Sequence, residues 1–185
     1  MRMSADTAAA RLLQDELQDL RSLTVHADHV RWVTVGQDAK SFELLVRYFS
    51  DEWRGWAERL AHRLVDRRWP PDGRVSALPD GSYRSWLSGE WLEISEAGDW
   101  MDHELRVLGN WARARSEEVD EPDVVRLLVE IEDGLATQLD QLTAWRGNRI
   151  RPLDLVVEAG LESFPASDPP SWWRGPPLGT TTYSP

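Results

Sequence analysis

The stretch WAERLAHRL places a carboxylate and an imidazole one helical turn apart, at Glu58 and His62. On a helix, residues four positions apart lie on one face, so both side chains can reach one ion. An oxygen ligand with an imidazole suits iron, zinc or manganese. Two ligands do not complete a site, and such a pair is also common on solvated helices. The pair therefore predicts a metal site only if other helices bring further ligands to it.

A second stretch, DHVRWVTVG at residues 28–36, has the composition of the edge of a site but carries Arg31 where a metal ligand is expected. A guanidinium stays protonated in proteins and does not bind a cation. The tryptophans Trp32, Trp53, Trp56 and Trp111 recur at helical spacing. Large aromatic side chains at this spacing favour a core or an interface over a cofactor pocket.

The elements that position these residues are long helices. Apolar residues recur at helical spacing over residues 5–35, before Gly36, and again over residues 38–68, before the prolines of WPPDG. Two more long helices are expected within residues 90–119 and over residues 123–145, with a short helix near residues 82–89. No segment alternates convincingly as a strand. The pattern predicts an all-α protein, an antiparallel four-helix bundle with a short helix between the second and third long helices.

The domain organisation follows from a change in composition near residue 148. Residues 1–148 form the predicted bundle, and residues 149–185 form a tail rich in Pro, Gly, Ser and Thr that includes Trp172 and Trp173. Such a composition does not build a core by itself. The paired tryptophans favour docking of the tail on its own or a neighbouring subunit, and the alternative is a segment that binds another protein.

Composition excludes several classes of function. The formal net charge is −11, with 32 acids against 21 bases, and Lys40 is the only lysine. A chain without a basic arm is not expected to bind DNA. The absence of cysteine excludes disulfides and thiolate metal sites. No run of 18 apolar residues occurs, so we expect a cytoplasmic protein that does not enter a membrane.

Several strings resemble the Dps group of the ferritin-like superfamily, the mini-ferritins. In that family the first helix ends in a His-Trp pair followed by Gly, and HVRWVTVG keeps Trp32 and Gly36. The second helix carries an Asp, then Glu-Arg four residues later; in WAERLAHRLVDRRWPPDG, Glu58 falls on the Asp, His62 on the Glu and Arg63 on the Arg. DVVRLLVEIEDGLATQLDQLTAW is similar to the closing helix of the family. The resemblance covers about residues 10–146.

The resemblance implies an iron-oxidising centre shared between two subunits. Its five ligand positions read Arg31, Glu43, Arg47, Glu58 and His62 in this sequence, and none keeps the family's residue. We therefore expect ion pairs in place of metal ligation, with the two arginines of one chain facing Glu58 and His62 of the other and Glu43 pairing with Arg47. The alternative is a residual iron site on Glu43, Glu58 and His62. Whether the chain is a ferroxidase stays open at this point.

By resemblance, the function is that of a Dps-like mini-ferritin, which binds and stores iron and protects against oxidative or starvation stress, with a degenerate centre. The implied partner is another copy of the chain, in a homo-oligomer with a dimer contact at the first two helices; a dodecamer is favoured. The alternative is a non-catalytic Dps-like shell or scaffold that recruits a partner protein through the Trp-rich tail.

Overall fold

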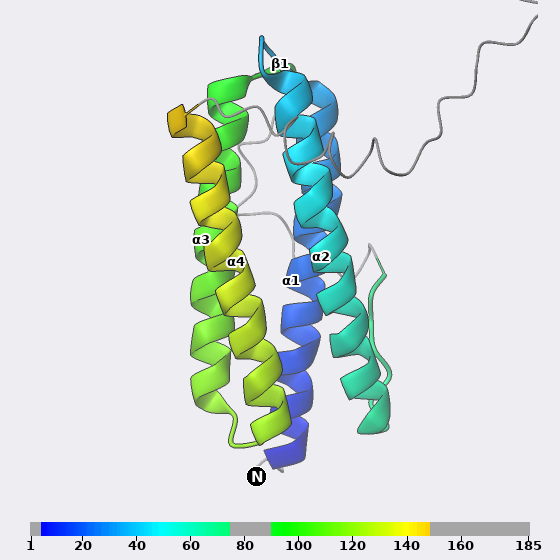
Figure 1. Ribbon diagram of the computed structural model, residues 1–185. Coiled ribbons are helices and arrows are strands. Elements are labelled where there is room, and N and C mark those ends of the chain that lie inside the picture. Colours follow the sequence, from blue (N-terminus) through cyan, green and yellow to red (C-terminus); the bar gives the residue numbers. More distant parts are fainter. Residues whose placement is uncertain (1–4, 75–89, 149–185) are drawn as a thin grey trace, which may run out of the picture. The chain divides into compact units, whose positions relative to one another are not determined.

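The computed structural model describes residues 5–74 and 90–148, which form a bundle of four long helices. These are α1 (Ala5–Val33), α2 (Ala39–Asp66), α3 (Ile94–Glu118) and α4 (Pro122–Asn148), shown side by side in Figure 1. The predicted four-helix bundle is confirmed. The bundle lies within the first of two compact units, Met1–Pro152. The short helix predicted near residues 82–89 and the tail, residues 149–185, lie outside the described residues.

The helix ends follow local chemistry. After α1, Gly36 has a φ of 123°, which other residues rarely adopt, and an added Cβ would lie 3.3 Å from the Ile94 side chain. Beyond α2, the two prolines at residues 70–71 cannot continue a helix. A capping box between Glu93 and Glu96 starts α3. Pro122 occupies the first position of α4, where a missing N–H is tolerated.

The sequence did not predict a small parallel sheet at one end of the bundle. Strands β1 (Thr34–Val35) and β2 (Leu92–Glu93) pair directly after α1 and directly before α3. This pairing fixes the end of α1 beside the start of α3, so these helices run in opposite directions. Two residues are too short to show the alternation by which strands are recognised in sequences.

The core lies between the inward faces of the four helices. α1 packs most extensively on α2, and α3 on α4. On α2 the predicted face is buried, with Phe42, Val46, Phe49, Trp53 and Leu60 fully enclosed. None of the helices in the described part of the chain carries an apolar stretch long enough to cross a membrane.

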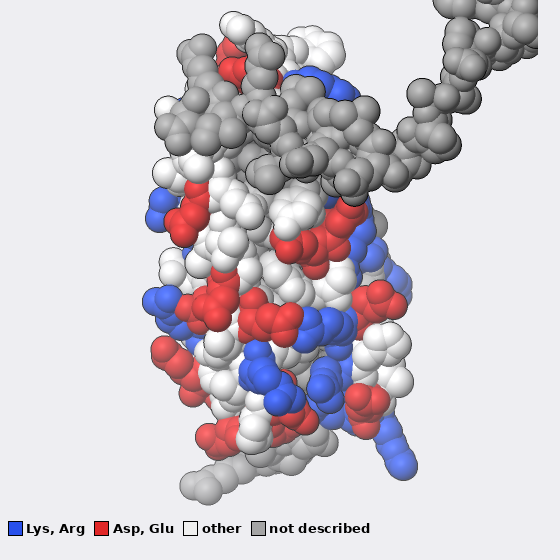
Figure 2. Space-filling view, in the orientation of Figure 1, with Lys and Arg blue, Asp and Glu red and all other residues white. Residues whose placement is uncertain are grey.

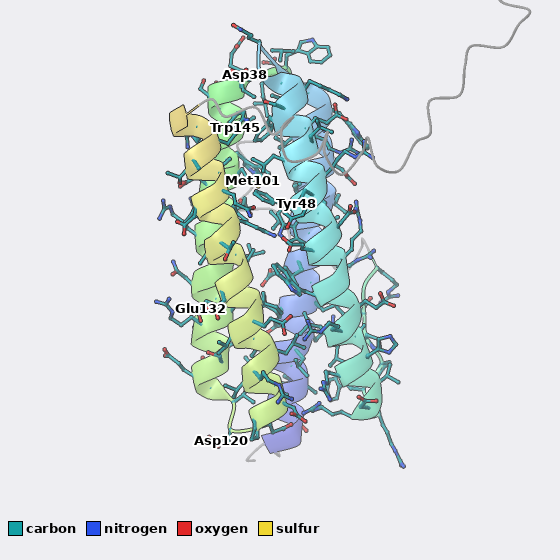
Figure 3. All side chains as sticks on the ribbon, in the orientation of Figure 1. Asp38, Tyr48, Met101, Asp120, Glu132 and Trp145 are labelled. Carbon is teal, nitrogen blue, oxygen red and sulfur yellow. The ribbon has the colours of Figure 1, made fainter. Side chains whose placement is uncertain are left out.

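A buried hydrogen-bonded chain connects α2 to α4 within this core. The Trp53 indole donates to Gln138 Oε1 at 2.7 Å, and Gln138 Nε2 donates to Glu52 Oε2 at 2.7 Å. The buried Trp53 indole and the buried Gln138 amide therefore both have partners, which avoids the cost of an unsatisfied donor or acceptor at these two side chains. Figure 3 shows how side chains fill the space between the helices.

Candidate functional site

The five residues that the resemblance places at ligand positions lie on α1 and α2. Arg31 is in the last turn of α1, and Glu43, Arg47, Glu58 and His62 are on α2. Fifteen residues separate Glu43 from Glu58, which on an α-helix corresponds to roughly 22 Å. Within one chain the five residues therefore form two groups, with Arg31, Glu43 and Arg47 in one and Glu58 and His62 further along α2 in the other.

In the first group, Arg31 and Glu43 are held together by ion pairs. Arg31 Nε donates to Asp28 Oδ1 at 2.9 Å, and Arg31 Nη1 lies 3.8 Å from Glu43 Oε1. Lys40 Nζ donates to Glu43 Oε2 at 2.8 Å. The hydrogen bond from Lys40, with further help from Arg31, holds the pKa of Glu43 below its ordinary value. Glu43 is therefore a charged carboxylate that already has two cationic partners.

Within the described chain, the expected pairing of Glu43 with Arg47 is not among the ion pairs that Glu43 forms, although the Arg47 charge also lowers the pKa of Glu43. Glu43 pairs with Lys40 and Arg31 instead, while the exposed Arg47 makes no ion pair within 4.0 Å to any residue that the structure describes. Sequence reasoning also missed Asp28 and Lys40. The available signal was the i,i+3 spacing of Asp28 with Arg31 and of Lys40 with Glu43.

Asp28 extends this group toward the middle of α2. Its Oδ2 lies 3.7 Å from Arg54 Nη2 on α2, so one carboxylate connects the end of α1 to the middle of α2. The chain of charges Lys40, Glu43, Arg31, Asp28 and Arg54 alternates in sign, and we name it the α1–α2 ion-pair network. Partly exposed pairs of this kind contribute about 0–1 kcal/mol each. Their main effect is to fix where the charges lie.

The second group, Glu58 and His62, is loosely arranged. His62 Nε2 lies 3.8 Å from Glu58 Oε1, which is too long for a hydrogen bond, and both side chains are about three-quarters exposed. Among the residues described for one chain, no group of three His, Asp or Glu side chains could hold a metal ion. A site that combines Glu43 with Glu58 and His62 would need two chains, and it stays a prediction.

The family's centre does not fit the residues found here. Arg31 holds its guanidinium against Asp28 and Glu43, where a ligand would have to approach the metal. A guanidinium offers no lone pair and repels a cation. The described chain therefore supplies an ion-pair network at this place, and we derive no oxidation step through it.

A hollow of about 490 Å³ lies beside the network, between α1 and α2. Its lining is partly apolar, with Leu17, Val25 and Ala57, and partly charged, with Asp28, Arg54 and Glu58. Near the end of α1, Trp32 is 64% exposed, and the Arg31 guanidinium lies 5.3 Å from the centroid of its ring. Of the four tryptophans noted in the sequence, Trp53 and Trp56 are buried in the core and Trp111 is partly buried against it. Trp32 instead exposes a large apolar surface near the end of α1.

A buried charged cluster that the sequence did not predict joins α1 to α3. Arg115 donates to Glu16 Oε2 at 2.5 Å and to Asp19 Oδ2 at 2.6 Å. Glu16 is fully buried, and its Oε1 accepts no hydrogen bond from the part of the chain that the structure describes. Burial raises the pKa of Glu16 to about 7, although the Arg115 charge opposes this. The cluster holds two helices together at an electrostatic cost that depends on pH.

Comparison with solved structures identifies the arrangement of the helices. Dps92 from Deinococcus radiodurans superposes with a TM-score of 0.70 at 19% identity, over 79% of this chain and 90% of that one. A Dps protein from Bacillus brevis gives 0.69 at 20% identity, over 78% and 99%. The chain has the fold of the Dps proteins. Dps from Microbacterium arborescens, in its high iron form, gives 0.68 at 17% identity, over 78% and 95%.

The Dps fold is shared without close sequence similarity. No protein-family model and no curated protein sequence matches this chain. At these identities the superpositions establish the arrangement of helices, and they do not establish shared chemistry. Function must therefore be argued from the α1–α2 face itself.

Proposed function

We propose that this chain forms a cytoplasmic, Dps-like closed homo-oligomer that retains iron as cargo and protects against oxidative or starvation stress without an active ferroxidase centre. The observation that carries the proposal is the Dps fold with Arg31 held by Asp28 and Glu43 at a ligand position. The high iron form of the similar Microbacterium arborescens protein supports the choice of iron.

The proposed subunit contact uses the α1–α2 face. The exposed Trp32 and Val25 offer apolar surface there, and the adjacent hollow is lined by both charges and apolar groups. Two copies related by a two-fold axis would bring this face against itself, which suits a network that carries both signs of charge. The resemblance favours twelve subunits. Light scattering that shows a monomer at micromolar concentration would contradict this assembly.

The absence of ferroxidase activity follows from charge. At an effective dielectric constant of about 20, two unit charges about 4 Å apart interact by roughly 4 kcal/mol, so a ferrous ion beside Arg31 or Arg47 is strongly disfavoured. We expect the wild-type protein to oxidise ferrous iron no faster than buffer. Removing only one arginine should not create activity, because one repelling charge and an incomplete ligand set remain.

The test restores the family's pattern at all five positions. The variant carries Arg31→His, Glu43→His, Arg47→Asp, Glu58→Asp and His62→Glu, and iron oxidation is followed by absorbance beside the wild type. Arg106→Gln on α3 is the control, because it removes an exposed arginine away from this face. We expect measurable oxidation only in the five-fold variant, provided that light scattering shows the same assembly for all three proteins.

Two results would contradict the proposal. Rapid, saturable oxidation by the wild type would mean that Glu43, Glu58 and His62 form a working site across two chains. An assembled five-fold variant that stays inert would mean that the positions carried over from the family do not meet in the oligomer.

A shell or scaffold without iron chemistry is the second candidate function. The α1–α2 ion-pair network favours it, because those pairs are complete without a metal. Aerobic loading with ferrous iron, gel filtration and metal analysis of the oligomer separate the two candidates. Iron that travels with the oligomer supports storage, and an oligomer without iron supports the scaffold.

A further inference from the structure

Three arginines on α2, which we name the arginine row, lie four residues apart at Arg59, Arg63 and Arg67, with Arg67 at the C-terminal cap. Like charges at this spacing repel, so each needs a partner of opposite sign. Arg59 forms a bidentate ion pair with Glu130 of α4. Arg67 pairs with Glu121, directly before α4. The two outer arginines therefore reach across the α2–α4 seam to glutamates.

The middle arginine meets a different residue. The two outer ion pairs set the register between the two segments. Arg59 and Arg67 are eight residues apart, and their partners Glu130 and Glu121 are nine residues apart in the opposite direction along the chain. Halfway, this register places residue 125 or 126 opposite Arg63. Arg126 lies there and is exposed. Arg63 therefore faces an arginine, whereas Arg59 and Arg67 each face a glutamate.

A hollow of about 310 Å³ lies at this point of the seam, and both arginines line it. Arg126 is bound to Asp123 at 2.5 Å, whereas Arg63 makes no ion pair within 4.0 Å to any residue that the structure describes. Figure 2 shows basic side chains gathered on this seam among acidic ones. The remaining lining consists of Arg59, His62, Asp66, Asp123 and Leu127.

We propose that this hollow binds a small oxyanion of the phosphate class, which bridges Arg63 and Arg126. Guanidinium groups present paired N–H donors that match phosphate oxygens, and an anion here would supply the charge that the row lacks at its middle position. The hollow lies at the start of α4, where the positive end of the helix dipole also favours an anion. Asp66 and Asp123 line the same hollow and oppose binding, so the attraction must come mainly from Arg63, while Arg126 would exchange part of its contact with Asp123 for the anion.

The ligand is a phosphoryl group of limited size. The hollow has a volume of about 310 Å³, which suits a small group, and a chain with net charge −11 repels an extended polyanion such as duplex DNA. Free phosphate and the phosphodiesters of DNA share this chemistry, and the experiment must separate them. All lining residues come from one chain, so this inference requires neither the proposed oligomer nor its iron, although His62 also belongs to the proposed subunit contact.

The test measures phosphate binding to the purified protein without added iron. Calorimetric titration and thermal unfolding are carried out in sodium phosphate and in sodium chloride of matched ionic strength. We expect saturable phosphate binding and a higher melting temperature in phosphate for the wild type. Arg63→Gln and Arg126→Gln should each weaken binding roughly tenfold or more, because each removes charge-assisted hydrogen bonds. Arg106→Gln, which removes an exposed arginine paired only within α3, should bind as the wild type does.

Stability without phosphate separates a binding role from a structural one. In chloride, Arg63→Gln should melt at the wild-type temperature or above, since it removes like-charge repulsion and no ion pair. Equal stabilisation by phosphate and chloride, or unchanged phosphate binding in both seam variants, would overturn the proposal. A 30-base-pair DNA duplex that binds while free phosphate does not would overturn it as well and would identify a nucleic-acid surface instead.

Discussion

Replacing Glu16 by glutamine tests the electrostatics of the buried cluster between α1 and α3. The Glu16 carboxyl group is fully buried and receives a hydrogen bond from Arg115 at 2.5 Å. Burial is the largest influence on its pKa and raises it from 4.5 to about 7; Arg115 lowers it, and the neighbouring charges of Asp19 and Asp15 raise it. Glutamine keeps the shape and can still accept the hydrogen bond, but it cannot ionise.

The sign of the effect follows from the raised pKa. The folded state holds the proton more tightly than the unfolded chain, so the stability contributed by Glu16 is complete below pH 4.5 and is lost as the pH rises through about 7. The difference between these pKa values corresponds to about 3 kcal/mol. Carboxylates whose pKa is lowered, such as Glu43 and Glu130, stabilise the fold when charged, and this contribution is lost as the pH falls. Their contribution is the same in the wild type and in Glu16→Gln, so it cancels in the comparison.

We therefore expect the stability of Glu16→Gln, relative to the wild type, to rise by about 3 kcal/mol between pH 4.5 and pH 8, or roughly 6–12 °C in melting temperature. Urea unfolding at fixed protein concentration measures this, because oligomers unfold in a concentration-dependent way. Glu117→Gln, at an exposed position on α3, is the control and should show no such trend. A difference between Glu16→Gln and wild type that does not change with pH would refute the reasoning.

Two predictions concern packing and hydrogen bonding between α2 and α4. Gly134→Ala should destabilise the fold by about 1–3 kcal/mol in urea unfolding, because an added Cβ would overlap the Trp56 ring; Gly109→Ala, whose Cβ would meet its nearest atom at 3.9 Å, should not. Trp53→Phe should cost about 1–3 kcal/mol, because it leaves the buried Gln138 Oε1 without its donor. Full stability of either variant at Gly134 or Trp53 would show that the core rearranges there.

The fold was largely predictable because helical periodicity is a local signal. The second helix was expected over residues 38–68 and is found at Ala39–Asp66, with the prolines at residues 70–71 beyond its end. The first was expected to residue 35 and ends at Val33, because Thr34 and Val35 leave the helix to pair with β2. The end of this helix therefore depends on pairing with residues more than fifty positions away, which no local sequence pattern predicts.

The positions of the charged residues were harder to predict, because the type of a charged residue does not determine whether its side chain is buried or exposed. Glu16 lies in QDELQDL, which has the composition of a solvated helix face, yet it is fully buried. Its partner Arg115 is 99 residues away. At the candidate site the presence of Arg31 was recognised, but its partner within the chain was not, since proximity to Glu43 depends on how α1 packs on α2.

The distribution of arginine explains why a count of bases misrepresents the surface of this protein. In the described residues, ion pairs that join different helices all use arginine: Arg31–Glu43, Arg54–Asp28, Arg59–Glu130, Arg113–Glu132, Arg115–Glu16, Arg115–Asp19 and Arg146–Asp99. The long, planar guanidinium can reach across a seam and bind both oxygens of a carboxylate, which a lysine ammonium cannot do.

Arginines used in this way carry charge that their partners already balance, so they add little to the attraction for a polyanion. This strengthens the expectation that duplex DNA is not retarded at physiological salt, because the cations free to meet phosphates are fewer than the 21 bases suggest. It also distinguishes Arg63 from the arginines paired across helices. Arg63, which has no carboxylate partner among the described residues, is available to a ligand from solution, and phosphate binding between Arg63 and the Asp123-paired Arg126 would occur at a site that net charge does not reveal.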